Sequence, residues 1–508
     1  MSGDLLEFAA GLQRAHEGRV PAEHRRSRGQ VFTPASVCRF MAAMIPMGPG
    51  RLRLLDAGAG VGSLAAAVCE RAIELRGPLE LAVTLCEDDE SLRPLIERNM
   101  SRCAVALEAV GSRLRYEVRG DFLAGDGGGR QRVLFADDTL GEFDAAIMNP
   151  PYFKTPPGNK GEDGTPNVYA GFLDRAIERL RPGGYLISIT PRSFCSGPYF
   201  REFRRRFFAR MGLEWVHLFE SRRKVFEGIL QESVIMCSRR GADIPGTVRI
   251  TTSRGAEVGA GLWSMDLPAA RLLGGSGGIE GIFIPTDEAD LGVLDAVAAW
   301  PGKFSDLRLK VSTGPVVPFR VRDRLSITID GGTVPLLGSH NVRPFRTTWP
   351  VRRGDKPIAF RVGGDSARHL IPSRNYVLLR RFSAKEERRR LTASWYLDDG
   401  APPRLLALEN HLNYVSHIDR ELSKAELFGM TAVFNSSLMD KYFRMISGNT
   451  QVNATEIRST PFPDLARIAA IGRLMSEMDG MYPAAIEEIV YEQLDVAPAL
   501  RASLRCSA

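Results

Sequence analysis

The stretch RLRLLDAGAGVGS, residues 51–63, decides the fold of this 508-residue chain. It begins as an apolar run of strand-forming length and ends in a turn that is rich in glycine. The residues that follow, GSLAAAVCERAIEL (62–75), repeat small apolar side chains at helical spacing. A strand that turns through glycines into a helix predicts the first unit of an α/β sheet.

The same alternation of apolar strands and amphipathic helices continues from residue 50 to about residue 240. It predicts a doubly wound, mixed sheet, in which ligands bind beyond the carboxyl ends of the strands. After residue 240 the pattern loosens, which indicates a domain junction, and residues 420–508 read as mainly helical. Strands are expected at 79–87, 113–122, 143–152, 184–191, 213–219 and 232–238, and helices at 89–100, 167–180 and 199–211.

The composition argues against a membrane-spanning, a secreted or a disulfide-rich protein. No apolar run reaches the 18 to 20 residues or so that cross a bilayer, and the N-terminus does not read as a signal peptide. The seven cysteines are scattered without a CxxC pair, which favours a reducing cytoplasm and argues against a disulfide framework or a zinc site.

The net charge of +7 is unevenly distributed along the chain. Residues 301–420 hold 22 Lys and Arg against 11 Asp and Glu, while the rest of the chain holds 45 against 49. Such a basic segment favours a polyanionic partner, and the alternative is a solvated basic face.

Polar residues at the ends of the first three strands favour a nucleoside-like cofactor. Asp56 opens a GxGxG string, and the next strand-end acid, Glu87, follows 31 residues later. A dinucleotide fingerprint has GxGxxG with an acid about 20 residues on, so this spacing favours S-adenosylmethionine. Asp121 and Phe122 end the third strand, where a carboxylate could accept from an adenine amine and a ring could pack beside it. For the glycine string the alternative is a tight turn between a strand and a helix. For Glu87 and its neighbours it is a helix N-cap cluster, and for Asp121 and Phe122 it is an ordinary turn.

The sequence Asn149-Pro150-Pro151-Tyr152, after the apolar run 145–148, is the most specific signal in the chain. The two prolines lack N–H donors and fix φ, so the Pro150 carbonyl and the Asn149 amide oxygen can point at one ligand. Two such acceptors suit an NH2 group whose nitrogen must become a nucleophile. Tyr152 adds a ring for stacking.

The order of glycine turn, Glu, Gly-Asp-Phe and Asn-Pro-Pro-Tyr resembles the gamma-class N6-adenine DNA methyltransferases. The stretch RGQVFTP (28–34) looks like the N-terminal cofactor motif of that class, and KVFEG (224–228) looks like its late motif, whose aromatic packs on a flipped base. Four C-terminal stretches resemble the PstI-type modification methylases of type II restriction-modification systems: 310–320, 376–391, 409–415 and 434–463.

The resemblance implies a Rossmann-like, S-adenosylmethionine-dependent catalytic domain (1–245) and a C-terminal α+β target-recognition domain (246–508). It implies no metal and an adenine that flips out of the duplex. It assigns catalysis to Asn149, Pro150, Pro151, Tyr152 and Phe226, the last with a core Phe as the alternative. Cofactor contacts are expected from Thr33, Pro34, Asp56, Gly58, Ala59, Gly60, Glu87, Asp88, Asp121 and Phe122.

The densest basic cluster lies in RRFSAKEERRR (380–390), which the sequence predicts to hold DNA, with a solvated helix face as the alternative. The expected partners are double-stranded DNA and a separate restriction endonuclease, with a monomer favoured. A rival interpretation of Asn-Pro-Pro-Tyr is methylation of an RNA guanine amine or a protein glutamine amide. The predicted DNA contacts are Arg380, Arg381, Lys385, Arg388, Arg389 and Arg390.

Overall fold

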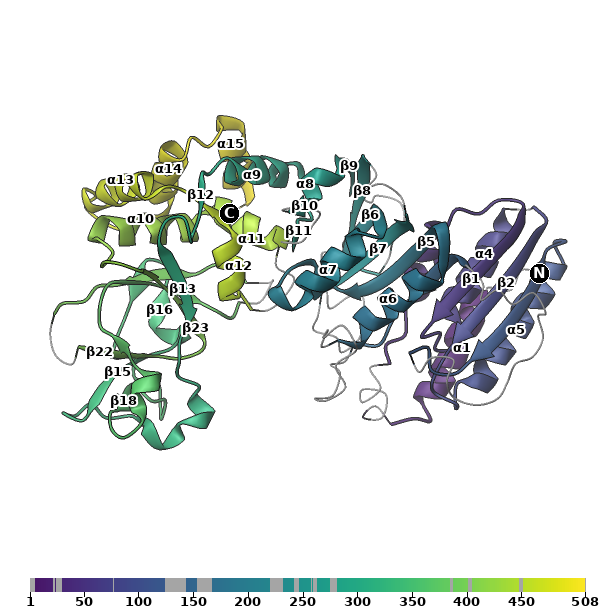
Figure 1. The fold of residues 1–508 in the computed structure, drawn as a ribbon, viewed down its shortest axis with the longest axis horizontal. Coiled ribbons are helices and arrows are strands. Elements are labelled where there is room, and N and C mark those ends of the chain that lie inside the picture. Colours follow the sequence, from purple (N-terminus) through teal and green to yellow (C-terminus); the bar gives the residue numbers. More distant parts are fainter. Residues whose placement is uncertain are drawn as a thin grey trace. The chain divides into compact units, whose positions relative to one another are not determined.

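A nine-stranded mixed sheet forms the core of the N-terminal half (Figure 1), in the order β3-β2-β1-β4-β5-β7-β6-β8-β9. Strands β3, β2, β1, β4 and β5 are parallel, and β7 runs antiparallel between β5 and β6. The order reverses between β1 and β4, which is where open α/β sheets bind ligands. The strands are β1 (Gly50–Ala57), β2 (Leu79–Cys86), β3 (Arg113–Arg119), β4 (Phe143–Met148), β5 (Leu180–Pro191), β6 (Met211–Phe219), β7 (Ser233–Arg240), β8 (Thr247–Ser253) and β9 (Trp263–Pro268).

The computed structural model describes most of the chain. Among the helices in the described part, none is both long and apolar enough to cross a membrane. The described residues are 5–21, 23, 30–75, 77–123, 143–152, 167–219, 232–241, 246–256, 258, 263–274, 281–383, 387–400, 404–446 and 451–507.

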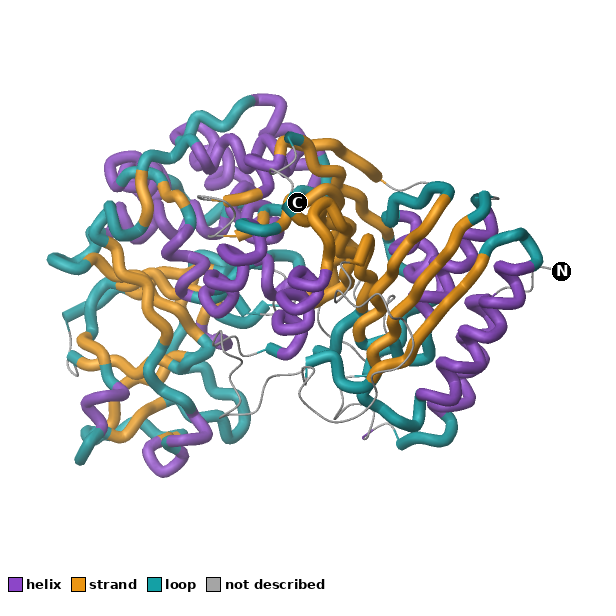
Figure 2. Tube along the Cα trace, turned by 45° about the vertical axis from the view of Figure 1, so that its right-hand side comes forward, coloured by secondary structure: helices purple, strands orange, loops and turns teal. Residues whose placement is uncertain are grey.

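Helices lie on both sides of these strands (Figure 2), so the strands read as continuous apolar runs. On one side, alternate residues of β1, β2, β4 and β5 share a core with α1, α3, α4 and α5. Helix α6 instead contacts β5 and β1, and α7 contacts β6. The doubly wound, mixed sheet predicted from the sequence is therefore confirmed. The helices are α1 (Leu5–Glu17), α3 (Ala35–Ala43), α4 (Ser63–Glu74), α5 (Arg93–Glu108), α6 (Val168–Arg179) and α7 (Arg201–Phe208).

The first compact unit extends further along the chain than the predicted boundary at 245/246. It comprises residues 1–195 and 199–284, and the second unit comprises 196–198 and 285–508. The physical reason is strand pairing: β8 pairs in parallel with β6, and β9 pairs antiparallel with β8. The residues after 240 thus form two further strands of the sheet, β8 and the edge strand β9, then a short α8 (Ala269–Leu272) and the β10–β11 pair (Leu273–Gly274, Gly281–Ile282).

The C-terminal unit contains two small sheets. One has the order β13-β23-β20-β21 and the other β14-β18-β15-β22-β19. Two small apolar clusters stabilise them, one around Leu378 and Leu408 and the other around Val316 and Phe360. Their strands are β13 (Leu309–Thr313), β14 (Leu325–Ser326), β15 (Thr333–Leu337), β18 (Ala359–Arg361), β19 (Ile371–Pro372), β20 (Tyr376–Arg380), β21 (Ala393–Tyr396), β22 (Leu405–Leu408) and β23 (Leu412–His417), with the hairpin β16 (Val342–Arg343) and β17 (Arg346–Thr347) and the pair β12 (Gly302–Lys303) and β24 (Pro461–Phe462).

The end of the chain is helical, as predicted. Helix α10 begins at a capping box in which Ser423 and Glu426 bond reciprocally. It crosses α13 closely, since a Cβ at Gly429 or Gly472 would meet the backbone of the other helix. The helices of this unit are α9 (Glu288–Ala298), α10 (Lys424–Asn435), α11 (Ser437–Ile446), α12 (Ala454–Ser459), α13 (Leu465–Ser476), α14 (Pro483–Gln493) and α15 (Pro498–Ser507).

Candidate active site

The carboxyl ends of four parallel strands bring the predicted site residues to one edge of the sheet. Ala57 pairs with Cys86, Cys86 pairs with Arg119, and Asp56 pairs with Ile147. The residues just beyond these pairs therefore follow neighbouring strands that are about 4.8 Å apart. This register explains why side chains from four distant parts of the sequence converge.

The glycine turn lets the backbone of β1 approach the next strands. Gly58 and Ala59 donate their N–H groups to the Cys86 carbonyl, at 2.9 and 3.0 Å. Gly58 has φ +78°, and a Cβ there would lie 3.5 Å from the Asn149 carbonyl oxygen. At Gly60, with φ +59°, a Cβ would lie 3.2 Å from the Phe32 ring. Larger residues would strain the backbone at both positions and crowd the site.

Hydrogen bonds to Glu87 join the glycine turn to the end of β2. Its Oε2 accepts from the Gly60 N–H at 2.8 Å, and its Oε1 accepts from the Asp89 N–H at 3.0 Å. Burial raises the pKa of Glu87 to about 7 against these two hydrogen bonds. A carboxylate can accept about four hydrogen bonds, so Glu87 keeps acceptor capacity for ribose hydroxyls. The neighbouring Asp88 is exposed.

Asp56 is fully buried at the start of the turn. Its Oδ2 accepts from the Ala65 N–H in α4 at 3.2 Å, and its Oδ1 has no hydrogen-bond partner among the described residues. Burial, with a smaller contribution from Glu87, raises its pKa to about 7. Buried acceptors in proteins are normally paired, so an orphaned carboxylate oxygen here fits a site completed by a ligand that carries donors.

Asp121 and Phe122 follow β3 as predicted. The Asp121 carboxylate is exposed and accepts from the Leu123 N–H at 2.8 Å. Phe122 is buried, with its ring centroid 5.3 Å from that of Phe172, and the Arg175 guanidinium lies over it. The loop after β3 therefore contributes a buried aromatic ring and an exposed carboxylate next to the glycine turn.

The Asn149 side chain is held in one orientation by the N-terminal segment. Its Nδ2 donates to the Val31 carbonyl at 2.8 Å and to the Thr33 hydroxyl at 3.0 Å. Its Oδ1 is buried and has no partner among the described residues. Because both N–H groups are engaged, the amide cannot flip without losing two hydrogen bonds. The oxygen is left as an acceptor, which is the role the sequence predicted for it.

The rest of the motif is rigid. Pro150 is buried, and Pro151 fixes the next φ without offering a donor. The Tyr152 hydroxyl donates to the Ile189 carbonyl in β5 at 2.9 Å, and burial raises its pKa. This hydrogen bond holds the hydroxyl end of the ring against β5.

Four further predicted residues complete the comparison between the sequence and the structure. Thr33 is buried, and Pro34 precedes the first turn of α3, where its missing N–H costs no hydrogen bond. Phe226 and Lys385 lie outside the described residues. Sequence reasoning missed the contacts that join the N-terminal segment to the sheet. Gln30, in the RGQVFTP stretch, donates to Asp89 Oδ2 at 2.8 Å. The sequence singled out both segments but did not predict that they are in contact.

The predicted DNA-contacting arginines are largely engaged within the C-terminal unit. Arg380 Nε donates to the carbonyls of Ser339 and Val342, at 3.1 and 2.9 Å. Arg381 donates to the Asn410 carbonyl at 3.1 Å and to Gln451 Oε1 at 3.2 Å. Both guanidinium groups therefore hold turns of the two small sheets, a structural role that the sequence did not predict.

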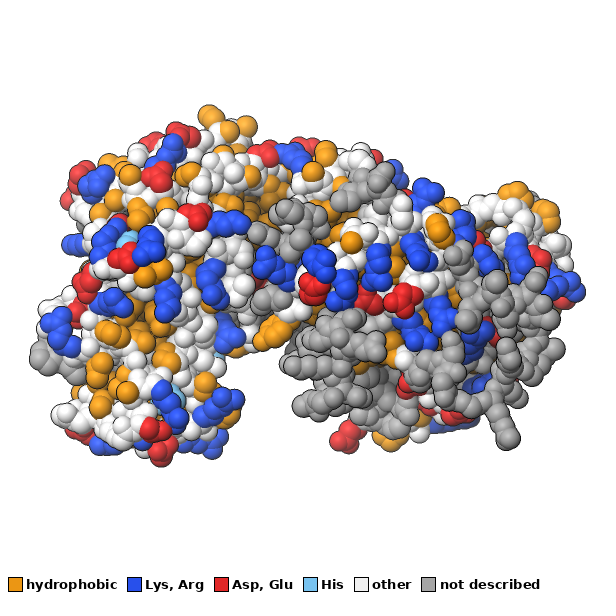
Figure 3. Space-filling model, in the orientation of Figure 1, with side chains coloured by type: hydrophobic (Ala, Val, Ile, Leu, Met, Phe, Trp, Pro, Cys, Tyr) orange, Lys and Arg blue, Asp and Glu red, His pale blue; other side chains and the backbone are white. Residues whose placement is uncertain are grey.

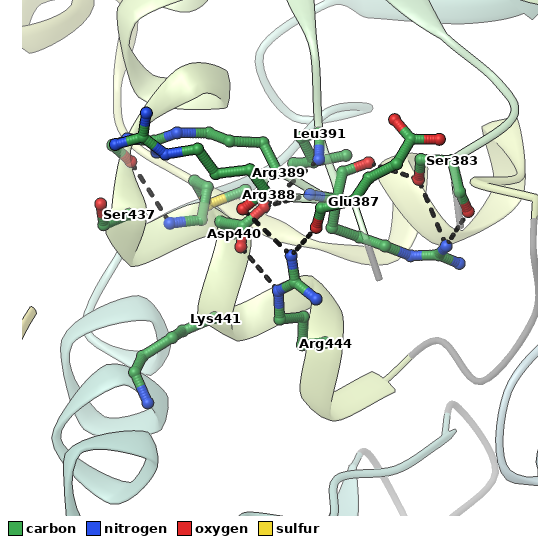
Figure 4. Close-up of polar contacts among 12 residues, drawn as sticks. Ser383, Glu387, Arg388, Arg389, Leu391, Ser437, Asp440, Lys441 and Arg444 are labelled. Atoms are coloured by element: carbon green, nitrogen blue, oxygen red, sulfur yellow. Dashed lines mark hydrogen bonds and ion pairs between the residues drawn. The ribbon is translucent and has the colours of Figure 1, made fainter. Parts of the chain in front are cut away.

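Two other arginines of this cluster, Arg388 and Arg389, lie beside Asp440 of α11 (Figure 4). Arg389 donates to the Asn435 carbonyl at 2.6 Å and pairs with Glu487. Arg390 is only 2% exposed, and its guanidinium donates to Ser383. Its burial does not fit the predicted DNA contact, because a buried guanidinium offers no surface to a phosphate. Arg388 is exposed, and its carbonyl accepts from Arg444 at 3.3 Å.

The hydroxyl of Thr33 gives a first prediction. Replacing it with valine removes one of the two acceptors of the Asn149 amide. We expect the rate of methyl transfer to fall about five- to tenfold, the worth of about one hydrogen bond, with little change in melting temperature. Thr33→Ser keeps the hydroxyl and should restore most of the rate in single-turnover assays. Equal losses in both variants would exclude this positioning role.

The raised pKa values of Asp56 and Glu87 give a second prediction. Both carboxyls are half protonated near pH 7, and only the ionised form accepts hydrogen bonds with both oxygens and neutralises a cation. A cationic cofactor should therefore release protons on binding, so its Kd rises as the pH falls from 8 to 5.5, about tenfold per pH unit for each group that must ionise. Calorimetry in buffers of different ionisation heat measures this release. A Kd that is constant over this range would contradict it.

The fold and the site define a class of enzyme. A sheet in which β7 runs antiparallel between β5 and β6, with a glycine turn after β1 and an acid after β2, is typical of the S-adenosylmethionine-dependent methyltransferases. S-adenosyl-L-methionine is the cofactor, and the residues that would hold it are those at the ends of β1, β2 and β3.

Comparisons with known proteins identify the family. The chain is 31% identical over 485 residues to the type II methyltransferase M.PstI of Providencia stuartii, covering 93% of this chain and 94% of that protein. It is 32% identical over 468 residues to the type II methyltransferase M.BsuBI of Bacillus subtilis, covering 90% and 91%. The chain therefore belongs to this family of type II methyltransferases.

A family model and a solved structure give two further comparisons. Residues 123–226 match the family model described as Eco57I restriction-modification methylase. The type IIL restriction-modification enzyme MmeI, solved in complex with DNA, is 10% identical and superposes with a TM-score of 0.50 over 90% of this chain and 70% of that chain. The likeness to MmeI shows the fold alone.

Proposed function

We propose that this protein is a site-specific DNA methyltransferase that transfers a methyl group to the N6 amine of an adenine flipped out of double-stranded DNA. The observation that carries the proposal is the orientation of Asn149. Its amide is pinned through Nδ2, while its buried Oδ1 has no partner among the described residues. An acceptor fixed in this way suits a neutral NH2 group that must lose its planarity to react.

In this proposal each residue of the motif has one task. The Asn149 Oδ1 and the Pro150 carbonyl accept the two amine hydrogens, which concentrates the nitrogen lone pair. Tyr152, held by Ile189, stacks on the base. The cofactor supplies an electrophilic methyl group on a cationic sulfur. The gain in rate then comes from positioning and from preorganised dipoles.

The biological role follows from the family. The relatives are named type II methyltransferases, and we infer that this chain methylates the target of a cognate restriction endonuclease and so protects host DNA. Its partners are then double-stranded DNA and, functionally, a separate nuclease.

Expression in a host that lacks adenine methylation tests the proposal. Sequencing that detects modified bases should find N6-methyladenine at every copy of one short motif. Unmodified DNA together with a methylated RNA guanine or protein glutamine would refute the proposed substrate and favour the rival class.

A further inference from the structure

A loop of the C-terminal unit carries a run of exposed cations. The sequence RPFRTTWPVRRGDK, residues 343–356, holds five Lys and Arg and a single acid, Asp355. All five cationic side chains are exposed. None of them has a side-chain hydrogen bond or ion pair with any residue in the described part of the unit. We call this set, Arg343, Arg346, Arg352, Arg353 and Lys356, the cationic strip.

Other exposed arginines of the same unit behave differently. Arg308 forms a bidentate pair with Asp419, with oxygen–nitrogen distances of 2.7 and 2.8 Å. Arg361 pairs with Asp330 at 3.4 Å, and Arg404 pairs with Asp398 at 3.6 Å. The unit therefore pairs several of its surface cations with carboxylates, whereas no such ion pair joins the strip to any described residue. Figure 3 shows Lys and Arg side chains distributed over the face of this unit that is in view, with hydrophobic and acidic side chains between them.

The backbone of the strip is nevertheless held firmly. The Phe345 N–H donates to the Ala393 carbonyl at 2.9 Å, and Phe345 closes the β16–β17 hairpin at φ +63°. The Thr347 hydroxyl donates to the Trp395 carbonyl at 2.6 Å. The Trp349 indole donates to the Ile358 carbonyl at 2.7 Å. A rigid loop that presents unpaired cations loses little conformational entropy when it meets an anionic surface.

Three cations of the strip also act on neighbouring groups. Burial lowers the pKa of Arg380, Glu387 opposes that shift, and Arg343 and Arg353 add to it. Burial lowers the pKa of His340, and Lys356, Arg353 and Arg380 act in the same direction against Glu409.

We propose that the cationic strip is the phosphate-contacting surface through which the C-terminal unit grips double-stranded DNA. This assignment rests on the proposed function, and it replaces Arg380, Arg389 and Arg390, whose guanidinium groups bond within the fold. Arg380 instead braces the turn from Ser339 to Val342, at the start of the strip. Phosphate contacts position a protein on the duplex and carry no sequence information, so the strip sets affinity and register.

A pair of triple variants tests the assignment. One removes three cations of the strip (Arg343→Gln, Arg353→Gln and Lys356→Gln), and the other removes three paired cations (Arg308→Gln, Arg361→Gln and Arg404→Gln). Both change the net charge equally. The binding of a synthetic duplex is measured between 50 and 300 mM salt with the full chain and its cofactor. Melting temperature and cofactor Kd report whether each variant is folded.

The strip variant should lower the slope of log K against log salt by about 2.7, since each phosphate contact contributes about 0.9. At 0.1 M salt its Kd should rise on the order of 100-fold, while the paired-cation variant changes less than threefold. Equal losses in the two variants, or no loss in the strip variant, would overturn the assignment while the proposed function stands. A wild-type chain that binds no DNA would instead refute the proposed function and the assignment together.

Discussion

Replacing Asn149 with alanine is expected to lower the rate of methyl transfer by about 100- to 1000-fold and to leave the cofactor Kd nearly unchanged. The substitution deletes the pinned Oδ1 acceptor, which in the proposal stabilises the amine only as it becomes nucleophilic. Removing one preorganised hydrogen-bonding group from an active site typically costs about 3–4 kcal/mol of transition-state stabilisation. Single-turnover transfer of a labelled methyl group to a duplex measures the rate.

A matched control is available in the C-terminal unit. Asn375 is also bonded at both ends of its amide, with Nδ2 donating to the Leu422 carbonyl and Oδ1 accepting from the Asp398 N–H. Asn375→Ala removes an equal number of bonds but should leave the rate of transfer within about threefold. A near-normal rate in Asn149→Ala would contradict the mechanism.

Replacing Tyr152 with alanine is expected to weaken capture of the flipped base by about 10- to 100-fold. Stacking of a base on an aromatic ring is worth about 1–3 kcal/mol, and extrusion of the base from the duplex must be offset by such contacts. A duplex with 2-aminopurine at the target position should brighten on binding the wild-type protein and much less with the variant. The cofactor Kd should change little.

The Tyr152→Phe variant shows whether the aromatic ring or its hydroxyl group is needed to capture the base. This variant keeps the ring but loses the 2.9 Å hydrogen bond to Ile189, so its fluorescence response should stay close to that of the wild type. A response as weak as that of the alanine variant would mean that the hydroxyl, rather than the ring, matters.

Much of the catalytic unit could be predicted from the sequence, because each element has a strong local signal. The turn at Asp56, the acid at Glu87 and the loop at Asn149 follow apolar runs, and parallel strands bring such ends together. The pinning of Asn149 by Val31 and Thr33 could not be predicted, since it joins residues 116 and more positions apart across a tertiary contact.

The C-terminal unit was harder to predict. Charge density alone pointed to residues 380–390, yet Arg390 is buried there and Arg389 pairs with Glu487. Counting charges cannot tell a paired guanidinium from an unpaired one, because the partner is set by the fold. The predicted domain boundary at 245/246 also differs from the structure, because β8 pairs with β6 and β9 pairs with β8, and strand pairing between distant segments leaves no local signal in the sequence.

The most direct test of the account is the chemical identity of the product. The protein is incubated with methyl-labelled S-adenosylmethionine and duplex DNA, the DNA is digested to nucleosides, and the labelled nucleoside is identified by mass spectrometry. The account predicts label on the N6 amine of deoxyadenosine, and its near-absence with Asn149→Ala. Label on any other atom, or none in DNA with the wild-type protein, would contradict it.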